Sequence, residues 1–152
     1  MTLGIREEIK ALAMDVDGLL TAHVKVDNEL ATKSSGFLSI FRAIDFGSLR
    51  EKSGSILKNL RNTEGAIRSL DTKGQVLTEP QNRFIELLEK YASALISHVE
   101  LFLKMISDLE ARSQNNGNVT LGSHMDNSRK YKESAQDYLR FGSEMNELFQ
   151  EI

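Results

Sequence analysis

The feature that most constrains this sequence is a run of apolar residues near its start, spaced alternately four and three positions apart. The run has twelve positions from Ile5 to Ile44, and ten of them are apolar. This spacing keeps the positions on one stripe of an α-helix, whereas a β-strand would distribute them over both faces. The sequence therefore predicts a long first helix that packs against other helices. The positions are Ile5, Ile9, Leu12, Val16, Leu19, His23, Val26, Leu30, Lys33, Phe37, Ile40 and Ile44.

A continuous helix from Ile5 to Ile44 would be much longer than the helix that follows it. At about 1.5 Å per residue the first helix would reach roughly 65 Å and the second about 40 Å. The first helix therefore either breaks, with Ser34, Ser35 and Gly36 as the favoured point, or packs its free end on another chain. The second alternative predicts a homodimer or a partner protein.

Turn and capping signals predict where the second helix begins and ends. Gly47 is expected to close the first helix, and Ser48 with Glu51 three residues later forms a capping-box pattern for the next one. This second helix is expected to end near Lys73, with Gly74 as its stop.

Thr78 and Gln81 repeat the capping-box pattern, and Pro80 is tolerated in the first helical turn, so a third helix is predicted to start here. Its apolar arc is wider than a coiled-coil stripe, which predicts the most buried helix of the protein. The seam positions are Phe84, Leu88, Tyr91, Leu95, His98, Phe102, Met105 and Leu109, and the arc is widened by Leu87, Ile96, Val99, Leu103 and Ile106.

A polar loop at residues 113–118 precedes a fourth helix, which is expected to start between Leu121 and Asn127. In this helix the small residues Ala135 and Gly142 could let a neighbouring backbone come close. Four helices with short connectors predict an all-α, antiparallel up-down four-helix bundle with a long first helix, formed by residues 1–152 as a single domain. The periodic positions of the fourth helix are Ser128, Tyr131, Ala135, Tyr138, Gly142, Met145, Phe149 and Ile152.

Composition excludes several kinds of site and partner. The 152 residues contain no Cys, so disulfides and thiolate metal sites are excluded. The formal charge of −3 does not indicate nucleic acid, and no such partner is expected. No early apolar run has the form of an export signal, and the most apolar window, Leu95 to Ile106, is too short and too polar to span a membrane. We therefore expect a soluble, cytoplasmic protein. Secretion by a route that needs no cleavable signal is a second possibility.

A short acidic motif offers a second interpretation of the chain. Asp15 directly follows the apolar segment 9–14, and Asp17 comes two residues later. This segment resembles motif I of the haloacid-dehalogenase-type phosphatases, in which a strand delivers an aspartate nucleophile and a second aspartate follows two residues later. The resemblance implies that Asp15 attacks phosphorus, that Asp17 is the general acid/base and that Mg²⁺ offsets their charge. It ends at Thr21, after which the family's other motifs do not follow in order.

The helical interpretation of the same residues places Asp15 and Asp17 in solvent on either side of an inward-facing Val16. It also accounts for the apolar seam that continues on both sides of the motif. We therefore expect a protein without enzymatic activity and keep the Mg²⁺-dependent phosphatase as the alternative.

The three histidines show no metal-ligand spacing. None of them belongs to a Glu-x-x-His or His-x-x-x-His pair, so neither a metal site nor a cofactor is expected. His23 and Lys33 occupy seam positions, where an isolated polar residue often fixes helix register or partner number. His98 lies in an apolar helix and is expected to be a hydrogen-bonded core or boundary residue.

Residues 48–74 carry six basic and three acidic residues, a net charge of +3, whereas the other segments are acidic. A basic helix could bind an acidic partner or a phosphate backbone. Because no aromatic residues are interleaved with the basic ones, we favour a solvated face whose charges complement the neighbouring acidic helices.

The segment 36–46 is apolar on nearly all sides, which predicts burial from more than one direction. Phe37, Leu38, Phe41 and Phe46 are therefore the candidate binding residues. The alternative is that this segment plugs the end of the bundle within one chain. We expect a non-enzymatic adaptor, scaffold or secretion- or toxin-associated protein that binds another protein or a second copy of itself.

Overall fold

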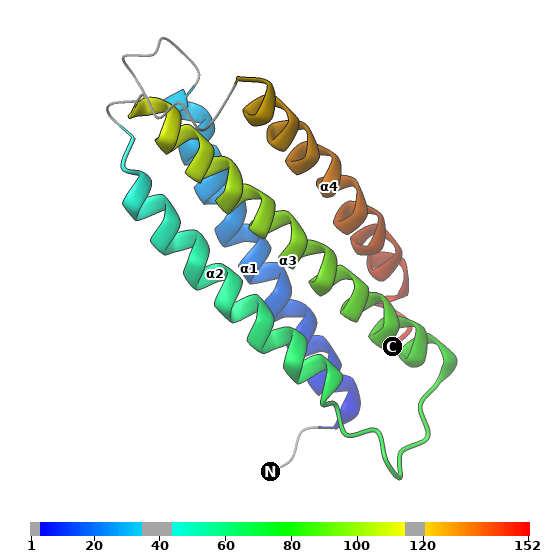
Figure 1. The fold of residues 1–152 in the computed structure, drawn as a ribbon. Coiled ribbons are helices and arrows are strands. Elements are labelled where there is room, and N and C mark those ends of the chain that lie inside the picture. Colours follow the sequence, from blue (N-terminus) through cyan, green and yellow to red (C-terminus); the bar gives the residue numbers. More distant parts are fainter. Residues whose placement is uncertain (1–3, 35–43, 115–120) are drawn as a thin grey trace.

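The structure is a computed structural model that describes residues 4–34, 44–114 and 121–152. Figure 1 shows a bundle of four helices: α1 (Ile5–Ser34), α2 (Phe46–Arg68), α3 (Glu79–Ser113) and α4 (Leu121–Leu148). The described ranges contain no β-strand, and the prediction of an all-α helical bundle is confirmed. None of the four helices has a stretch that is both long and apolar enough to cross a membrane.

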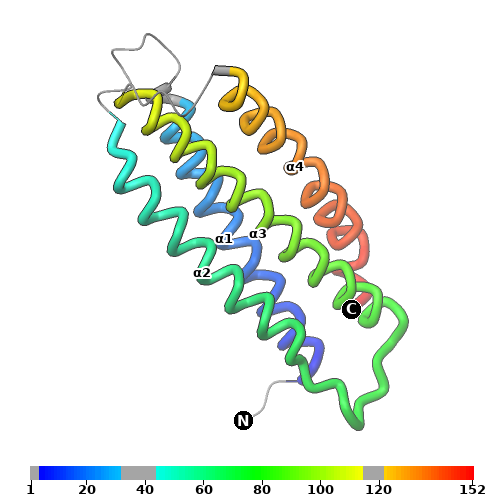
Figure 2. Tube along the Cα trace, in the orientation of Figure 1, coloured from blue at the N-terminus to red at the C-terminus, as the bar shows by residue number. Residues whose placement is uncertain are grey.

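Helices that follow one another in the sequence run in opposite directions, as the colours from blue to red show in Figure 1 and Figure 2, whereas α1 and α3 run in the same direction. Side-chain contacts give the same directions. Arg68 near the end of α2 pairs with Glu89 near the start of α3 at 3.0 Å. The side-chain amide of Gln81 at the start of α3 donates to the carbonyl of Ile152 after α4, at 3.2 Å. The end of the chain therefore lies beside the beginning of α3.

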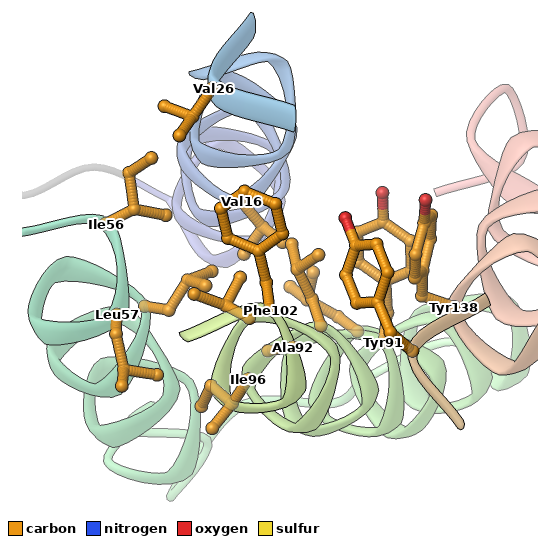
Figure 3. Close-up of a cluster of buried hydrophobic side chains, with 14 of the residues drawn as sticks. Val16, Val26, Ile56, Leu57, Tyr91, Ala92, Ile96, Phe102 and Tyr138 are labelled. Atoms are coloured by element: carbon orange, nitrogen blue, oxygen red, sulfur yellow. The ribbon is translucent and has the colours of Figure 1, made fainter. Parts of the chain in front are cut away.

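Helix α3 is the central helix, because it packs against each of the other three. The prediction that it is the most buried helix is confirmed. Figure 3 shows its side chains Ala92, Ile96 and Phe102 meeting Val16 of α1 and Leu57 of α2 in the core. Its buried residues are Phe84, Leu87, Leu88, Tyr91, Ala92, Leu95, Ile96, His98, Val99, Phe102, Met105, Ile106 and Leu109.

The capping box predicted for α3 is confirmed. The Thr78 hydroxyl accepts a hydrogen bond from the Gln81 backbone N–H at 3.2 Å, and the Gln81 side chain accepts one from the Thr78 N–H at 3.0 Å. Two N–H groups that helix formation leaves unpaired are thereby satisfied, so the start of the central helix is fixed.

The capping box predicted for α2 is wrong in its position. The N-cap is Asp45, whose carboxylate accepts a hydrogen bond from the Ser48 N–H at 2.9 Å. Ser48 and Gly47 therefore belong to the first turn of α2, and Gly47 does not close the preceding helix. Aspartate caps a helix as well as serine does. Asp45 is the cap here because Phe46, the residue after it, begins the buried face of α2.

The end predicted for α2 is also displaced. The helix ends at Arg68, with Ser69 as its C-cap, and the Asp71 carboxylate then accepts the Lys73 N–H at 3.1 Å in a turn outside the helix. Gly74 has a φ of 75°, a left-handed conformation that favours glycine, but it lies in the connector to α3.

The first helix is described to Ser34, so the continuation expected as far as Ile44 falls on residues 35–43, which lie outside the described residues. Ile44 itself is buried. Most of the periodic apolar positions of α1 face inward: Ile9, Val16, His23, Val26 and Leu30 are buried, and Ile5, Leu12 and Leu19 are half-buried.

The basic residues of α2 pair with acidic residues of the neighbouring helices, in agreement with the interpretation that its charges complement those of its neighbours. Arg50, Arg61 and Arg68 pair with the α3 residues Glu110, Glu100 and Glu89, respectively. Lys52 pairs with Glu29 of α1 at 3.2 Å. These surface pairs contribute little stability one by one, about 0 to 1 kcal/mol each, but they align α2 with its neighbours.

Candidate functional site

Helices α1 and α4 both pack on α3, and their own backbones stay apart. Over the ranges the structure describes, no Cα atom of α1 comes within 8 Å of a Cα atom of α4. Large side chains bridge this space at two points, from His23 to Tyr131 and from Lys10 to Phe149. We call the surface between the two helices the α1–α4 seam, and it is the candidate functional site.

The first bridge is a buried polar contact. The Nε2 atom of His23 lies 2.9 Å from the hydroxyl of Tyr131, and His23 is only 1% exposed. The Tyr131 hydroxyl donates to the carboxylate of Asp27, one helical turn after His23. The hydroxyl is therefore the acceptor for the Nε2–H of His23, and α1 and α4 are joined by a chain of two hydrogen bonds.

His98 of α3 contacts both residues of this bridge. Its Nδ1–H donates to the Ser134 hydroxyl at 2.6 Å, and that hydroxyl donates in turn to the Tyr131 carbonyl at 2.6 Å. The His98 ring also stacks on Tyr131, with ring centroids 4.2 Å apart and planes 17° apart. His23 meets His98 edge to face at 5.0 Å. The expectation that His98 is a hydrogen-bonded core residue is confirmed.

Burial keeps this cluster uncharged, apart from Asp27 at its edge. Burial lowers the pKa of His23 to about 4, and burial together with the nearby His23 lowers the pKa of His98 to about 4. Burial first, then the charge of Asp27, raises the pKa of the Tyr131 phenol far above its ordinary value. Burial also raises the pKa of Asp27, an effect opposed by its hydrogen bond from Tyr131. Both imidazoles and the phenol are therefore neutral near pH 7.

Between the two bridges the seam opens into a pocket of about 270 Å³. Phe84 and Tyr91 of α3 form its floor. Figure 3 shows the hydroxyl of Tyr91 directed away from α3, on the same side as the hydroxyl of Tyr138. The walls are Ala13, Met14 and Asp17 from α1, and Gly142, Met145, Asn146 and Phe149 from the C-terminal part of the chain.

Gly142 leaves room for the floor of this pocket. A Cβ atom at this position would lie 3.0 Å from Cε2 of Tyr91. A small residue at 142 therefore does permit a close approach, as the sequence suggested, although the neighbour is an aromatic ring and not a backbone.

The rims of the seam carry exposed apolar side chains. Met14 and Val24 of α1 are 69% and 41% exposed, and Leu139 of α4 is 59% exposed. Val24 follows the pocket residue Asp17 by seven positions, and Leu139 precedes the pocket residue Asn146 by seven, so each lies on the stripe of its helix that borders the seam.

The two aspartates of the phosphatase-like motif lie on α1 and are both exposed, with Val16 fully buried between them. Segment 9–14 is helical, so the strand that the phosphatase motif requires before its nucleophile is not present there. The aspartates also face different neighbours: Asp15 lines a shallow hollow against α2, whereas Asp17 lines the seam pocket.

Of the four binding residues expected from the sequence, the structure describes one. Phe37, Leu38 and Phe41 lie outside the described residues. Phe46 is the first residue of α2 and is buried in the core, 7% exposed. The binding surface expected at 36–46 stays a prediction.

Sequence reasoning did not find the seam. Helical periodicity marked His23, Tyr131 and Gly142 as inward-facing, but it does not reveal which residues of two distant helices oppose each other.

Within the described ranges no three His, Cys, Asp or Glu side chains are grouped as a metal site would need.

Comparisons with known proteins gave no match: no family model, no curated protein and no solved structure is similar enough to this chain to inform its function.

Proposed function

We infer that this chain is a non-enzymatic helical bundle that acts by binding another protein, and that the α1–α4 seam is the binding surface. The observation that supports this function is the separation of α1 from α4. Among the described helices, the backbone of α4 comes close to that of α3 only, and the sides of α1 and α4 that border the seam keep Met14, Val24 and Leu139 exposed.

The occupant that fits the seam best is an amphipathic helix of the partner. A helix laid between two antiparallel helices inserts apolar residues at three- and four-residue spacing. Met14 and Val24 are ten residues apart, about 15 Å along α1, so two to three turns of a partner helix would contact both. The carboxylate of Asp17 lies between them and makes no ion pair within the described parts of the chain, so it favours a partner helix with a basic residue beside its apolar face.

The test compares a seam variant with a matched surface variant. The seam variant is Val24→Glu with Leu139→Glu. The control is Val76→Glu, because Val76 is fully exposed in the connector between α2 and α3. Proteins retained by the wild-type chain from the native cell are purified, and their binding to each variant is measured by calorimetry.

The expected result is a partner bound equally by the wild type and the Val76→Glu variant and at least about tenfold more weakly by the seam variant, since two buried carboxylates would lack partners. Equal binding to all three proteins would contradict the seam. If light scattering shows a dimer that only the seam variant loses, the occupant of the seam is a second copy of this chain and not a partner helix. A strict monomer that retains no protein would contradict the function.

A further inference from the structure

The seam pocket combines a negative charge with an aromatic and apolar interior. Its volume of about 270 Å³ exceeds the roughly 150 Å³ of a cavity that holds benzene. The pocket is open to solvent on one side, where Asp17 is exposed. A molecule somewhat larger than one aromatic ring could therefore enter it without unfolding the bundle.

The charge of the pocket comes from Asp17 alone among its lining residues. Tyr91 faces the same pocket, and burial together with the charge of Asp17 raises its pKa to about 12, so its hydroxyl stays protonated and adds no second negative charge. The amide of Asn146 is the other polar group of the lining. An anionic ligand would meet a carboxylate here, whereas a cation would find a counter-ion.

The aromatic rings favour the same sign of charge. Phe84 and Phe149 lie together with ring centroids 6.2 Å apart, and Tyr91 completes the floor. The faces of such rings attract cations. The protein already uses Phe149 in this way, because the Lys10 ammonium lies 4.9 Å from the centroid of its ring at the end of the seam.

We propose that the pocket lined by Asp17, Phe84, Tyr91, Gly142 and Met145 binds a small organic ammonium ion whose body is an aromatic ring or a branched apolar group. The ammonium pairs with the Asp17 carboxylate at the mouth. The apolar body enters the space that Gly142 leaves open beside Tyr91, against the partly exposed ring of Phe149. The thioethers of Met14 and Met145 adapt to its shape.

The same chemistry could be supplied by a lysine side chain of a partner protein. The volume of the pocket favours the free amine, because an unbranched lysine side chain would fill less of the space than a ring or a branched group. The experiment includes a lysine mimic to distinguish these two sources.

The experiment titrates the purified 152-residue chain with phenethylamine, with its neutral analogue 2-phenylethanol and with the anion phenylacetate, followed by ¹H–¹⁵N NMR. The lysine mimic is Nα-acetyl-lysine methylamide. Asp17→Asn removes the charge of the pocket, and Asp15→Asn is the matched control, since Asp15 is also exposed, two residues away on the same helix, but faces α2.

Phenethylamine is expected to bind about 1.5- to fivefold more tightly than 2-phenylethanol, the range for an exposed ion pair, and phenylacetate more weakly than either. The amide shifts are expected at Ala13, Gly142 and Met145, and not at Lys52 or Ser55 in the hollow between α1 and α2. Asp17→Asn is expected to remove the preference for the amine, and Asp15→Asn is expected to leave it unchanged.

Four outcomes would overturn the proposal: no shifts at the pocket residues, equal affinity for the amine and the alcohol, loss of the preference in both aspartate variants, or tighter binding of the lysine mimic than of phenethylamine. The titration uses the chain alone, so its result does not depend on whether a partner protein is found.

Discussion

The hydroxyl of Tyr131 on α4 lies 2.9 Å from Nε2 of His23 on α1, although the backbones of these two helices stay apart over the described ranges. One hydrogen bond between residues 108 positions apart in the sequence thus sets the distance across one end of the seam. Because both side chains are buried, loss of either partner leaves a polar group without its hydrogen bond.

Tyr131→Phe is therefore expected to lower the free energy of unfolding by about 1 to 3 kcal/mol. His23→Leu should have a similar effect, and the double variant should cost less than the sum of the two single changes, since the contact can be lost only once. Urea unfolding followed by circular dichroism measures all three. Additive costs would show that His23 and Tyr131 do not stabilise each other.

The pKa values of His23 and His98 make stability depend on pH. Both are lowered to about 4 from an ordinary value of 6.5, so between these pH values the unfolded chain binds protons that the folded chain does not. The free energy of unfolding should therefore fall as the pH drops from about 6.5 to about 4, by up to about 3.5 kcal/mol for each histidine, since one pKa unit corresponds to about 1.4 kcal/mol. Asp27, whose pKa is raised, acts in the opposite direction at lower pH.

Urea unfolding at pH 7.0 and pH 4.5 tests this dependence, with a variant that carries His23→Leu as the comparison. Of the two buried imidazoles this variant keeps only His98, so its stability should change less between the two pH values. An equal change in both proteins would show that His23 is not responsible.

Gly142→Ala tests the close contact between α4 and α3. An alanine in the middle of a helix is favoured over glycine by about 1 kcal/mol, but here its Cβ would lie 3.0 Å from the Tyr91 ring. We expect the contact to cancel or exceed the gain. Gly18→Ala on α1 is the matched control, because nothing lies within 4 Å of its Cβ position, and it should be stabilising by up to about 1 kcal/mol. Equal stabilisation by the two changes, measured by thermal unfolding, would contradict the contact.

Thr78→Ala removes half of the capping box of the central helix. The change should cost about 0.5 to 2 kcal/mol, because the Gln81 N–H loses its acceptor. Ser48→Ala is the comparison, since the N-cap of α2 is Asp45 and Ser48 only donates its backbone N–H to it. Its cost in urea unfolding should be smaller than that of Thr78→Ala, and the reverse order would contradict the assignment of the caps.

The four helices could be predicted from the sequence because apolar periodicity reports directly which face of a helix is buried, as for Val16 between two exposed aspartates. The cap at Thr78 could be predicted because its pattern is local. The cap of α2 could not, because Asp45 and Ser48 both suit a helix start and the burial of Phe46 decides between them. The meeting of His23 with Tyr131 depends on how whole helices pack, which periodicity within one helix does not contain.

The central claim is that function resides in the α1–α4 seam, and methionine methyl NMR tests it most directly. Met14 and Met145 line the seam pocket, whereas Met105 is buried in the core and Met125 is exposed near the start of α4. With ¹³C-methyl-methionine protein, adding the purified partner should shift or broaden the Met14 and Met145 signals and leave those of Met105 and Met125 in place. Changes at Met125 with no change at Met14 and Met145 would contradict the claim.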